Sequence, residues 1–149
     1  MTNNNYQAEI TVPASAEEAF AKINEVSRWW TAHLTGNSCQ TNDIFTVTFG
    51  TTFVTFKIVD MIPHHTIVWH VTDCNIQQVS DKKEWKNTKI VWELFPKNGN
   101  TTVKMTHLGL APGVECYDMC NAGWNFFIKE SLFNLLTEDR GFPDRQKAA

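Results

Sequence analysis

The sequence lacks an apolar stretch that approaches the roughly 20 residues of a membrane-spanning helix, so no membrane span is expected. Its first residues, 1–5, contain no apolar signal core. It also lacks positive charge: 13 Lys and Arg against 16 Asp and Glu give a net charge of -3. Because nucleic-acid binding requires clustered Lys and Arg, no nucleic-acid partner is expected. A cytoplasmic location is the default expectation.

Motifs of several enzyme classes are missing as well. The sequence contains no nucleophile elbow, phosphate loop or dinucleotide fingerprint. Among the carboxylates, Asp60 and Asp73 share the parity of inward-facing residues, but both lie at the ends of expected strands. The sequence therefore favours a binding protein over an enzyme, and it predicts neither catalytic residues nor a cofactor.

The four cysteines are expected to be reduced, because nothing indicates a disulfide scaffold or an oxidising compartment. Cys116 and Cys120 are four residues apart on an expected helix, and together with His107 they offer three metal ligands. A zinc site normally needs four ligands, or three and a water molecule, and there is no second cysteine pair. No metal site is predicted.

What remains is ordinary globular composition, with 42% hydrophobic and 19% charged residues in 149 residues. This length is enough to bury a core in one domain. No internal repeat, low-complexity tract or linker divides the chain, so a single domain over residues 1–149 is expected.

The first third of the chain predicts one strand and two short helices. Residues 6–12 alternate as a strand that Pro13 ends, and Ser15 with Glu18 has the spacing of a capping box before a helix over 16–23. Residues 27–34 predict a second short helix that carries Trp29 and Trp30.

The middle of the chain has the period-two pattern of half-buried antiparallel strands. Five such strands are expected over residues 43–50, 51–60, 66–72, 88–95 and 102–108. Asn98-Gly99 predicts a tight hairpin turn between the last two. The long segment between Cys74 and Asn87 is polar, and its charged cluster at residues 81–86 is expected to be a solvated loop.

The last third predicts one long helix from about Glu115 to Asp139, with Gly141 as its terminator. Gly123 lies inside this helix, where glycine costs roughly 1 kcal/mol relative to alanine. Such a glycine often marks the close approach of another backbone or of a ligand. A long helix laid across a curved sheet leaves a cavity between them, which suggests an apolar small molecule as ligand.

Together, these features resemble a known superfamily. The similarity rests on residues 10–20, on Trp29-Trp30, on Gly123-Trp124, and on the ending from Ser131-Leu132 to Gly141-Phe142-Pro143. The chain resembles the START-like (SRPBCC) superfamily, in the branch named after activators of the heat-shock chaperone ATPase. The resemblance implies an α+β helix-grip fold, in which a curved antiparallel sheet wraps around a long C-terminal helix and two short helices follow strand 1. Members include lipid carriers, hormone receptors and polyketide cyclases.

Ligand-binding candidates follow from strand parity and helix spacing. The strands offer Phe49, Phe56, Trp69, Trp92, Met105 and His107, and the helix offers Tyr117, Cys120, Asn121 and Trp124. The indole N–H groups of Trp69 and Trp92 each need an acceptor from protein, water or ligand. Alternatively, these two rings fill the cavity.

His107 is the one histidine that parity places inside, and it is either a polar group for a ligand or a hydrogen-bonded core residue. Three functions remain open. The first is binding of an apolar or aromatic small molecule, as a monomer or homodimer. The second is a cyclase- or dehydratase-like activity that uses His107. The third is a chaperone-interaction module that uses the outside of the sheet.

Overall fold

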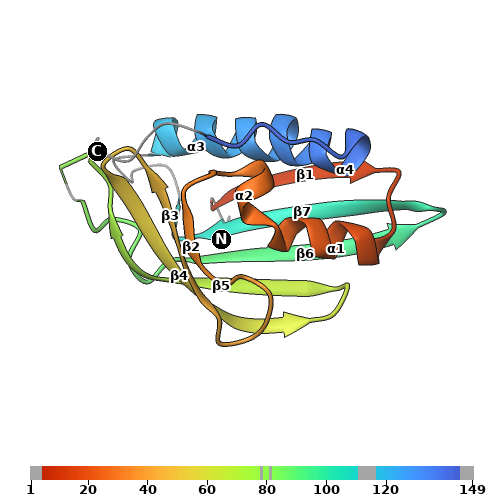
Figure 1. Ribbon diagram of the computed structural model, residues 1–149, viewed down its shortest axis with the longest axis horizontal. Coiled ribbons are helices and arrows are strands. Elements are labelled where there is room, and N and C mark those ends of the chain that lie inside the picture. Colours follow the sequence, from red (N-terminus) through yellow and green to blue (C-terminus); the bar gives the residue numbers. More distant parts are fainter. Residues whose placement is uncertain (1–4, 78, 81, 111–116, 145–149) are drawn as a thin grey trace.

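A computed structural model describes residues 5–77, 79–80, 82–110 and 117–144 (Figure 1). The strands are β1 (Tyr6–Val12), β2 (Leu34–Gly36), β3 (Ile44–Phe49), β4 (Thr52–Ile62), β5 (Thr66–Asn75), β6 (Lys89–Lys97) and β7 (Asn100–Leu108). The helices are α1 (Ala16–Asn24), α2 (Val26–Trp29), α3 (Tyr117–Phe126), the π-helix η1 (Phe127–Leu132) and α4 (Phe133–Glu138).

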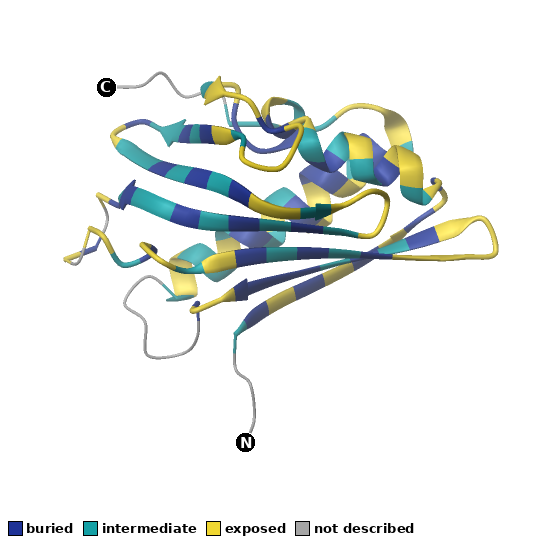
Figure 2. Ribbon diagram, turned by 90° about the horizontal axis from the view of Figure 1, so that it is seen from below, coloured by how far each residue is buried: buried dark blue, intermediate teal, exposed yellow. Residues whose placement is uncertain are grey.

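The strands form one antiparallel sheet in the order β1-β7-β6-β5-β4-β3-β2. Buried and more exposed residues alternate along the strands (Figure 2), as expected for a sheet with one packed face and one wet face. Helix α1 packs against β6 and β7, and the C-terminal helices pack against β1. The expected α+β architecture with a gripped C-terminal helix is confirmed. No helix in the described ranges is long and apolar enough to cross a bilayer.

Local sequence signals account for the element ends. The Ser15 hydroxyl accepts a hydrogen bond from the Glu18 backbone N–H at 3.0 Å and so caps α1. Asn98 and Gly99 have φ values of 53° and 83°, which allow the two-residue turn between β6 and β7.

The second short helix is shorter than predicted. Helix α2 ends at Trp29, and the predicted helical residue Leu34 instead begins strand β2, which pairs with β3. Residues 31–33 instead form hydrogen bonds with β3 near the edge of the sheet. The Thr31 hydroxyl donates to the Thr48 carbonyl at 2.9 Å, and the Thr48 N–H donates to the His33 carbonyl at 3.1 Å. These contacts with a distant strand override the local helical pattern.

The C-terminal helical segment is continuous over the described residues 117–138, but its middle is the π-helix η1, which the sequence did not predict. The predicted start near Glu115 lies outside the described residues. Within η1, the Ser131 hydroxyl donates to the Trp29 carbonyl at 2.6 Å and accepts from the Phe142 N–H at 2.7 Å. One side chain thus joins the helix to α2 and to the chain beyond it.

Gly141 is not the helix terminator that the sequence predicts. The helix ends at Glu138, and its C-cap residue Asp139 adopts the left-handed conformation with φ 60° and ψ 28°. Gly141 is needed for close packing instead, because a Cβ there would lie 2.2 Å from the Arg28 carbonyl oxygen.

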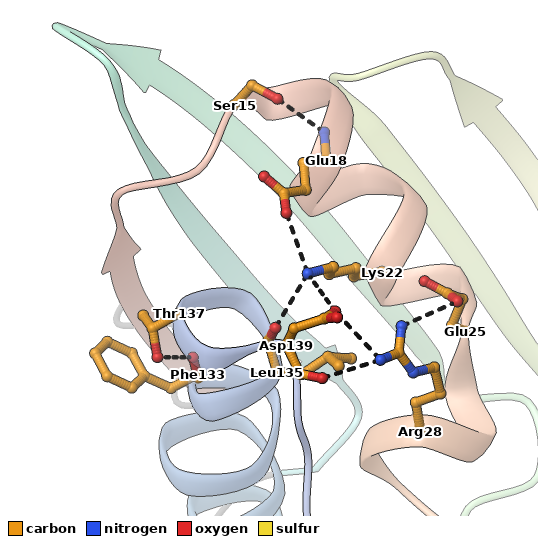
Figure 3. Close-up of polar contacts among 9 residues, drawn as sticks. All are labelled: Ser15, Glu18, Lys22, Glu25, Arg28, Phe133, Leu135, Thr137 and Asp139. Carbon is orange, nitrogen blue, oxygen red and sulfur yellow. Dashed lines mark hydrogen bonds and ion pairs between the residues drawn. The ribbon is translucent and has the colours of Figure 1, made fainter.

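Asp139 also joins the end of the helix to α1 and α2 through ion pairs (Figure 3). Its carboxylate lies 2.9 Å from Lys22 Nζ and 3.2 Å from Arg28, and Lys22 also pairs with Glu18 at 3.1 Å. Hydrogen bonds from Lys22 and Arg28 lower the pKa of Asp139. Lys22 additionally donates to the Leu135 carbonyl at 3.2 Å. This network fixes the C-terminal end of the helical segment against α1 and α2.

The segment between β5 and β6 is not the simple solvated loop that its charge predicts. Ile76, Val79 and Trp85 are buried, with Trp85 7% exposed. Three apolar side chains face inward while the lysines around them face solvent, so the loop forms part of the core wall.

Candidate functional site

Trp30 lies at the centre of an aromatic cluster on the inner face of the sheet. Its ring centroid is 4.8 Å from that of Trp124, 5.6 Å from Phe56, 5.7 Å from Trp29 and 6.2 Å from Trp69. Aromatic rings at these separations gain about 0.5–1.5 kcal/mol per pair beyond their burial. Trp29 is additionally fixed, because its indole N–H donates to the Ile23 carbonyl at 3.1 Å.

A pocket of about 190 Å³ opens beside Trp30, between α3, the ends of β3 and β4, and the loop before β6. None of its lining residues carries a formal charge; they are Trp30, Phe49, Thr52, Val54, Ile76, Trp85, Met119, Cys120, Gly123, Trp124 and Phe127. Apolar lining with few polar groups is typical of small-molecule sites.

Gly123 contributes to this pocket by having no side chain. Cys120, Gly123 and Trp124 share one face of α3 through spacings of three and four residues. A Cβ built at Gly123 meets no heavy atom within 4 Å. Apart from the backbone of the helix itself, no described atom occupies this position, so Gly123 leaves open space at the pocket wall.

Behind the pocket wall, a series of hydrogen bonds joins the indole of Trp124 to the backbone of Trp85. Trp85 and Trp124 stack with centroids 5.9 Å apart, and both rings meet His107 edge-on. The Trp124 indole N–H donates to His107 Nδ1 at 3.1 Å. His107 Nε2 lies 2.9 Å from the Thr88 hydroxyl, which donates to the Trp85 carbonyl at 2.6 Å.

These hydrogen bonds determine the protonation state of His107. An indole nitrogen can only donate, so Nδ1 is the acceptor and Nε2 carries the proton that Thr88 accepts. Burial lowers the pKa of His107 to about 3. His107 is therefore a neutral residue that orients Trp124 and Thr88, and both of its ring nitrogens are already engaged.

Trp69 and Trp92 lie deeper than the pocket. Both are fully buried, and their ring centroids are 5.5 Å apart. Neither indole N–H has a hydrogen-bond acceptor among the described residues. A buried donor without an acceptor costs about 1–3 kcal/mol, so these two indoles are unsatisfied polar groups within the core.

The structure brings together some of the ten sequence-predicted ligand residues and separates others. Phe49, Cys120 and Trp124 line the pocket. The core rather than the pocket wall contains Phe56, Trp69, Trp92, Met105 and His107. Tyr117 and Asn121 are partly exposed on α3 and lie outside the pocket lining.

Among the pocket residues that sequence reasoning missed are two tryptophans, Trp30 and Trp85. Trp85 is a single aromatic residue among charged neighbours, and that contrast was the available signal. Within the described ranges, no three His, Cys, Asp or Glu side chains group as metal ligands. Cys116, which the metal hypothesis needs, lies outside those ranges.

The fold and the pocket define a helix-grip protein, and comparison with known proteins supplies the family. The family model described as activator of Hsp90 ATPase homolog 1-like protein matches residues 15–137, so the chain belongs to this family. No curated protein sequence matches the chain.

Solved structures share the fold. The solution structure of the Aha1 dimer from Colwellia psychrerythraea is similar with a TM-score of 0.77 and 24% identity, over 95% of this chain and 100% of that one. DynU16, from the dynemicin biosynthetic locus, gives a TM-score of 0.72 and 17% identity, over 97% of this chain and 52% of that one. CalU16 from Micromonospora echinospora gives 0.62 and 10%, over 83% and 70%.

Proposed function

We propose that this protein binds an apolar or aromatic small molecule in the pocket between its sheet and α3. The observation that carries the proposal is Gly123, a helix-interior glycine on the pocket face whose missing side chain leaves open space. A helix glycine is destabilising by about 0.5–1 kcal/mol relative to alanine, and no packing contact within the described part of the chain explains it. Room for a ligand does explain it.

The pocket sets the size of the ligand. An apolar cavity of about 150 Å³ accommodates one benzene ring, and this pocket measures about 190 Å³. A compact molecule of one or two fused rings fits this space. Because the lining carries no formal charge and an unpaired buried charge is costly, the ligand is neutral.

The arrangement of His107 supports binding rather than a cyclase-like reaction. A general acid or base needs a nitrogen within reach of the substrate and a pKa near the working pH. Both nitrogens of His107 are engaged by Trp124 and Thr88, and its pKa of about 3 keeps it neutral. We therefore assign His107 to the frame of the pocket.

A cytoplasmic location and a monomeric or homodimeric state are part of the proposal. Cys39, Cys74 and Cys120 are free thiols, as is usual for proteins of reducing compartments. The relative from Colwellia psychrerythraea is described as a dimer. Light scattering coupled to size exclusion distinguishes the two states for this chain.

Tetralin, a neutral two-ring hydrocarbon, is a suitable probe for the binding proposal. In a titration followed by ¹H–¹⁵N spectra, we expect saturable shifts of the Trp85 and Trp124 indole signals. Gly123→Leu places a side chain in the pocket and should weaken binding at least tenfold. The matched control is Ala122→Leu, because Ala122 is exposed on the same helix and lies outside the pocket lining. Equal affinity of both variants and the parent would refute the proposal.

A further inference from the structure

Two indole N–H groups without a described acceptor lie behind Trp30, deeper than the pocket. Trp30 lines the pocket, and its ring stacks on Trp69 with an interplanar angle of 8°. Trp69 in turn contacts Trp92. Trp30 is therefore the side chain that connects the pocket with the two indole N–H groups that have no acceptor among the described residues.

Trp30 is held differently from its neighbour Trp29. The Trp29 indole N–H is bonded to the Ile23 carbonyl, whereas the described contacts of the Trp30 ring are with other aromatic rings. Trp30 is also the C-cap residue of α2, directly before the irregular residues that lead to β2. Turning its ring breaks stacking contacts but no hydrogen bond within the described structure.

Resting on the binding function proposed above, we propose that the ligand carries a neutral carbonyl-type oxygen and that it displaces the Trp30 ring. The oxygen then accepts hydrogen bonds from the indole N–H groups of Trp69 and Trp92. A carbonyl oxygen has two lone pairs and can accept from both donors. The preferred ligand class is thus a ring ketone, quinone or lactone rather than a pure hydrocarbon.

The charge around the two indoles favours a neutral acceptor over a carboxylate. Their described ring neighbours are Trp29, Trp30, Phe45 and Phe56, and no ion pair of the described residues lies among them. A carboxylate would lose its hydration there without gaining a cationic partner, at a large cost in free energy. A ketone loses far less hydration and gains two donors.

A matched pair of probes tests this inference: tetralin and 1-tetralone differ in one carbonyl oxygen. We expect 1-tetralone to bind at least fivefold more tightly than tetralin, which is about the worth of one hydrogen bond. In ¹H–¹⁵N spectra, 1-tetralone should move the indole proton signals of Trp69 and Trp92 downfield, and tetralin should not.

Substitution of single indoles supplies the control. Trp69→Phe keeps a ring but removes one donor, and the preference for 1-tetralone should fall about fivefold. Trp29→Phe removes an indole N–H that is already bonded to Ile23, and the preference should stay at the parent value. The backbone region of each spectrum shows whether the variant is folded.

The possible failures are distinguishable. If tetralin binds as well as 1-tetralone and only Trp85 and Trp124 respond, the ligand stays in the outer pocket and this inference is wrong while the binding function stands. If neither probe binds, the binding function itself is wrong. An unchanged preference in Trp69→Phe would also overturn the inference, because the proposed donor would then have no effect.

Discussion

Alanine at Gly123 should make the protein more stable and its ligand affinity weaker. Glycine inside a helix costs about 0.5–1 kcal/mol relative to alanine, and the added Cβ meets no heavy atom within 4 Å. The unfolding free energy should therefore rise by about 0.5–1 kcal/mol, which raises the Tm by on the order of 2 °C at this chain length.

The same methyl group occupies the wall of the pocket. Crowding a well-packed apolar site by one methyl group typically costs about 1–3 kcal/mol, so tetralin should bind roughly 5- to 150-fold more weakly. Urea denaturation measures the first effect and a tetralin titration measures the second. A destabilised variant, or a stabilised one with undiminished affinity, would refute the assignment of Gly123 to the ligand.

Ala122→Gly provides the opposite control. Ala122 is exposed on the same helix and lies outside the pocket lining. Its replacement should lower the unfolding free energy by about 0.5–1 kcal/mol and leave tetralin affinity unchanged. The two variants should change the unfolding free energy in opposite directions, but only Gly123→Ala should change the affinity for tetralin. This difference separates occupation of the pocket from general effects on the helix.

Three further predictions concern the frame of the pocket. His107 has a pKa of about 3 when folded and about 6.5 when unfolded, so the unfolded state takes up a proton that the folded state excludes. The unfolding free energy should fall as the pH drops from 6.5 towards 3, by up to about 1.4 kcal/mol per pH unit, and urea titrations of His107→Phe should lack this contribution. Thr88→Val should cost about 1–3 kcal/mol, because His107 Nε2 loses its acceptor; an unchanged urea midpoint would contradict the hydrogen-bond chain. Cys120 in the pocket should react with a thiol reagent, and bound tetralin should protect it. Cys74 is buried and has a raised pKa, so it should react slowly with or without tetralin. Labelling of Cys120 at the same rate with and without tetralin would place the ligand elsewhere.

Strand faces were predictable because side chains in a strand alternate with a period of two. This parity correctly placed Trp69, Trp92 and His107 on the inward face of the sheet, where all three are buried. It fails where the sheet is irregular: the register of β4 with β5 shifts between Ile58 and Asp60. The carboxylate of Asp60, which has inward parity in sequence, is therefore on an exposed residue.

The pocket wall was less predictable, because long-range contacts determine it. Trp85 lies in a charged loop, and only its stacking on Trp124 brings it into the core. Trp30 falls in a segment that reads as helix, but the sheet edge ends that helix at Trp29. Neither contact produces a periodic hydrophobic pattern in the surrounding sequence, so the sequence did not identify Trp30 or Trp85 as ligand candidates.

Native mass spectrometry of the protein purified from its own host tests the central claim most directly, when it is paired with the Gly123→Leu variant produced in the same cells. The binding function predicts a species heavier than the 17.0 kDa chain by the mass of one small neutral molecule. That species should be missing or strongly reduced in the variant. The bare chain mass in both samples, or the same added mass in both, would contradict a ligand in this pocket.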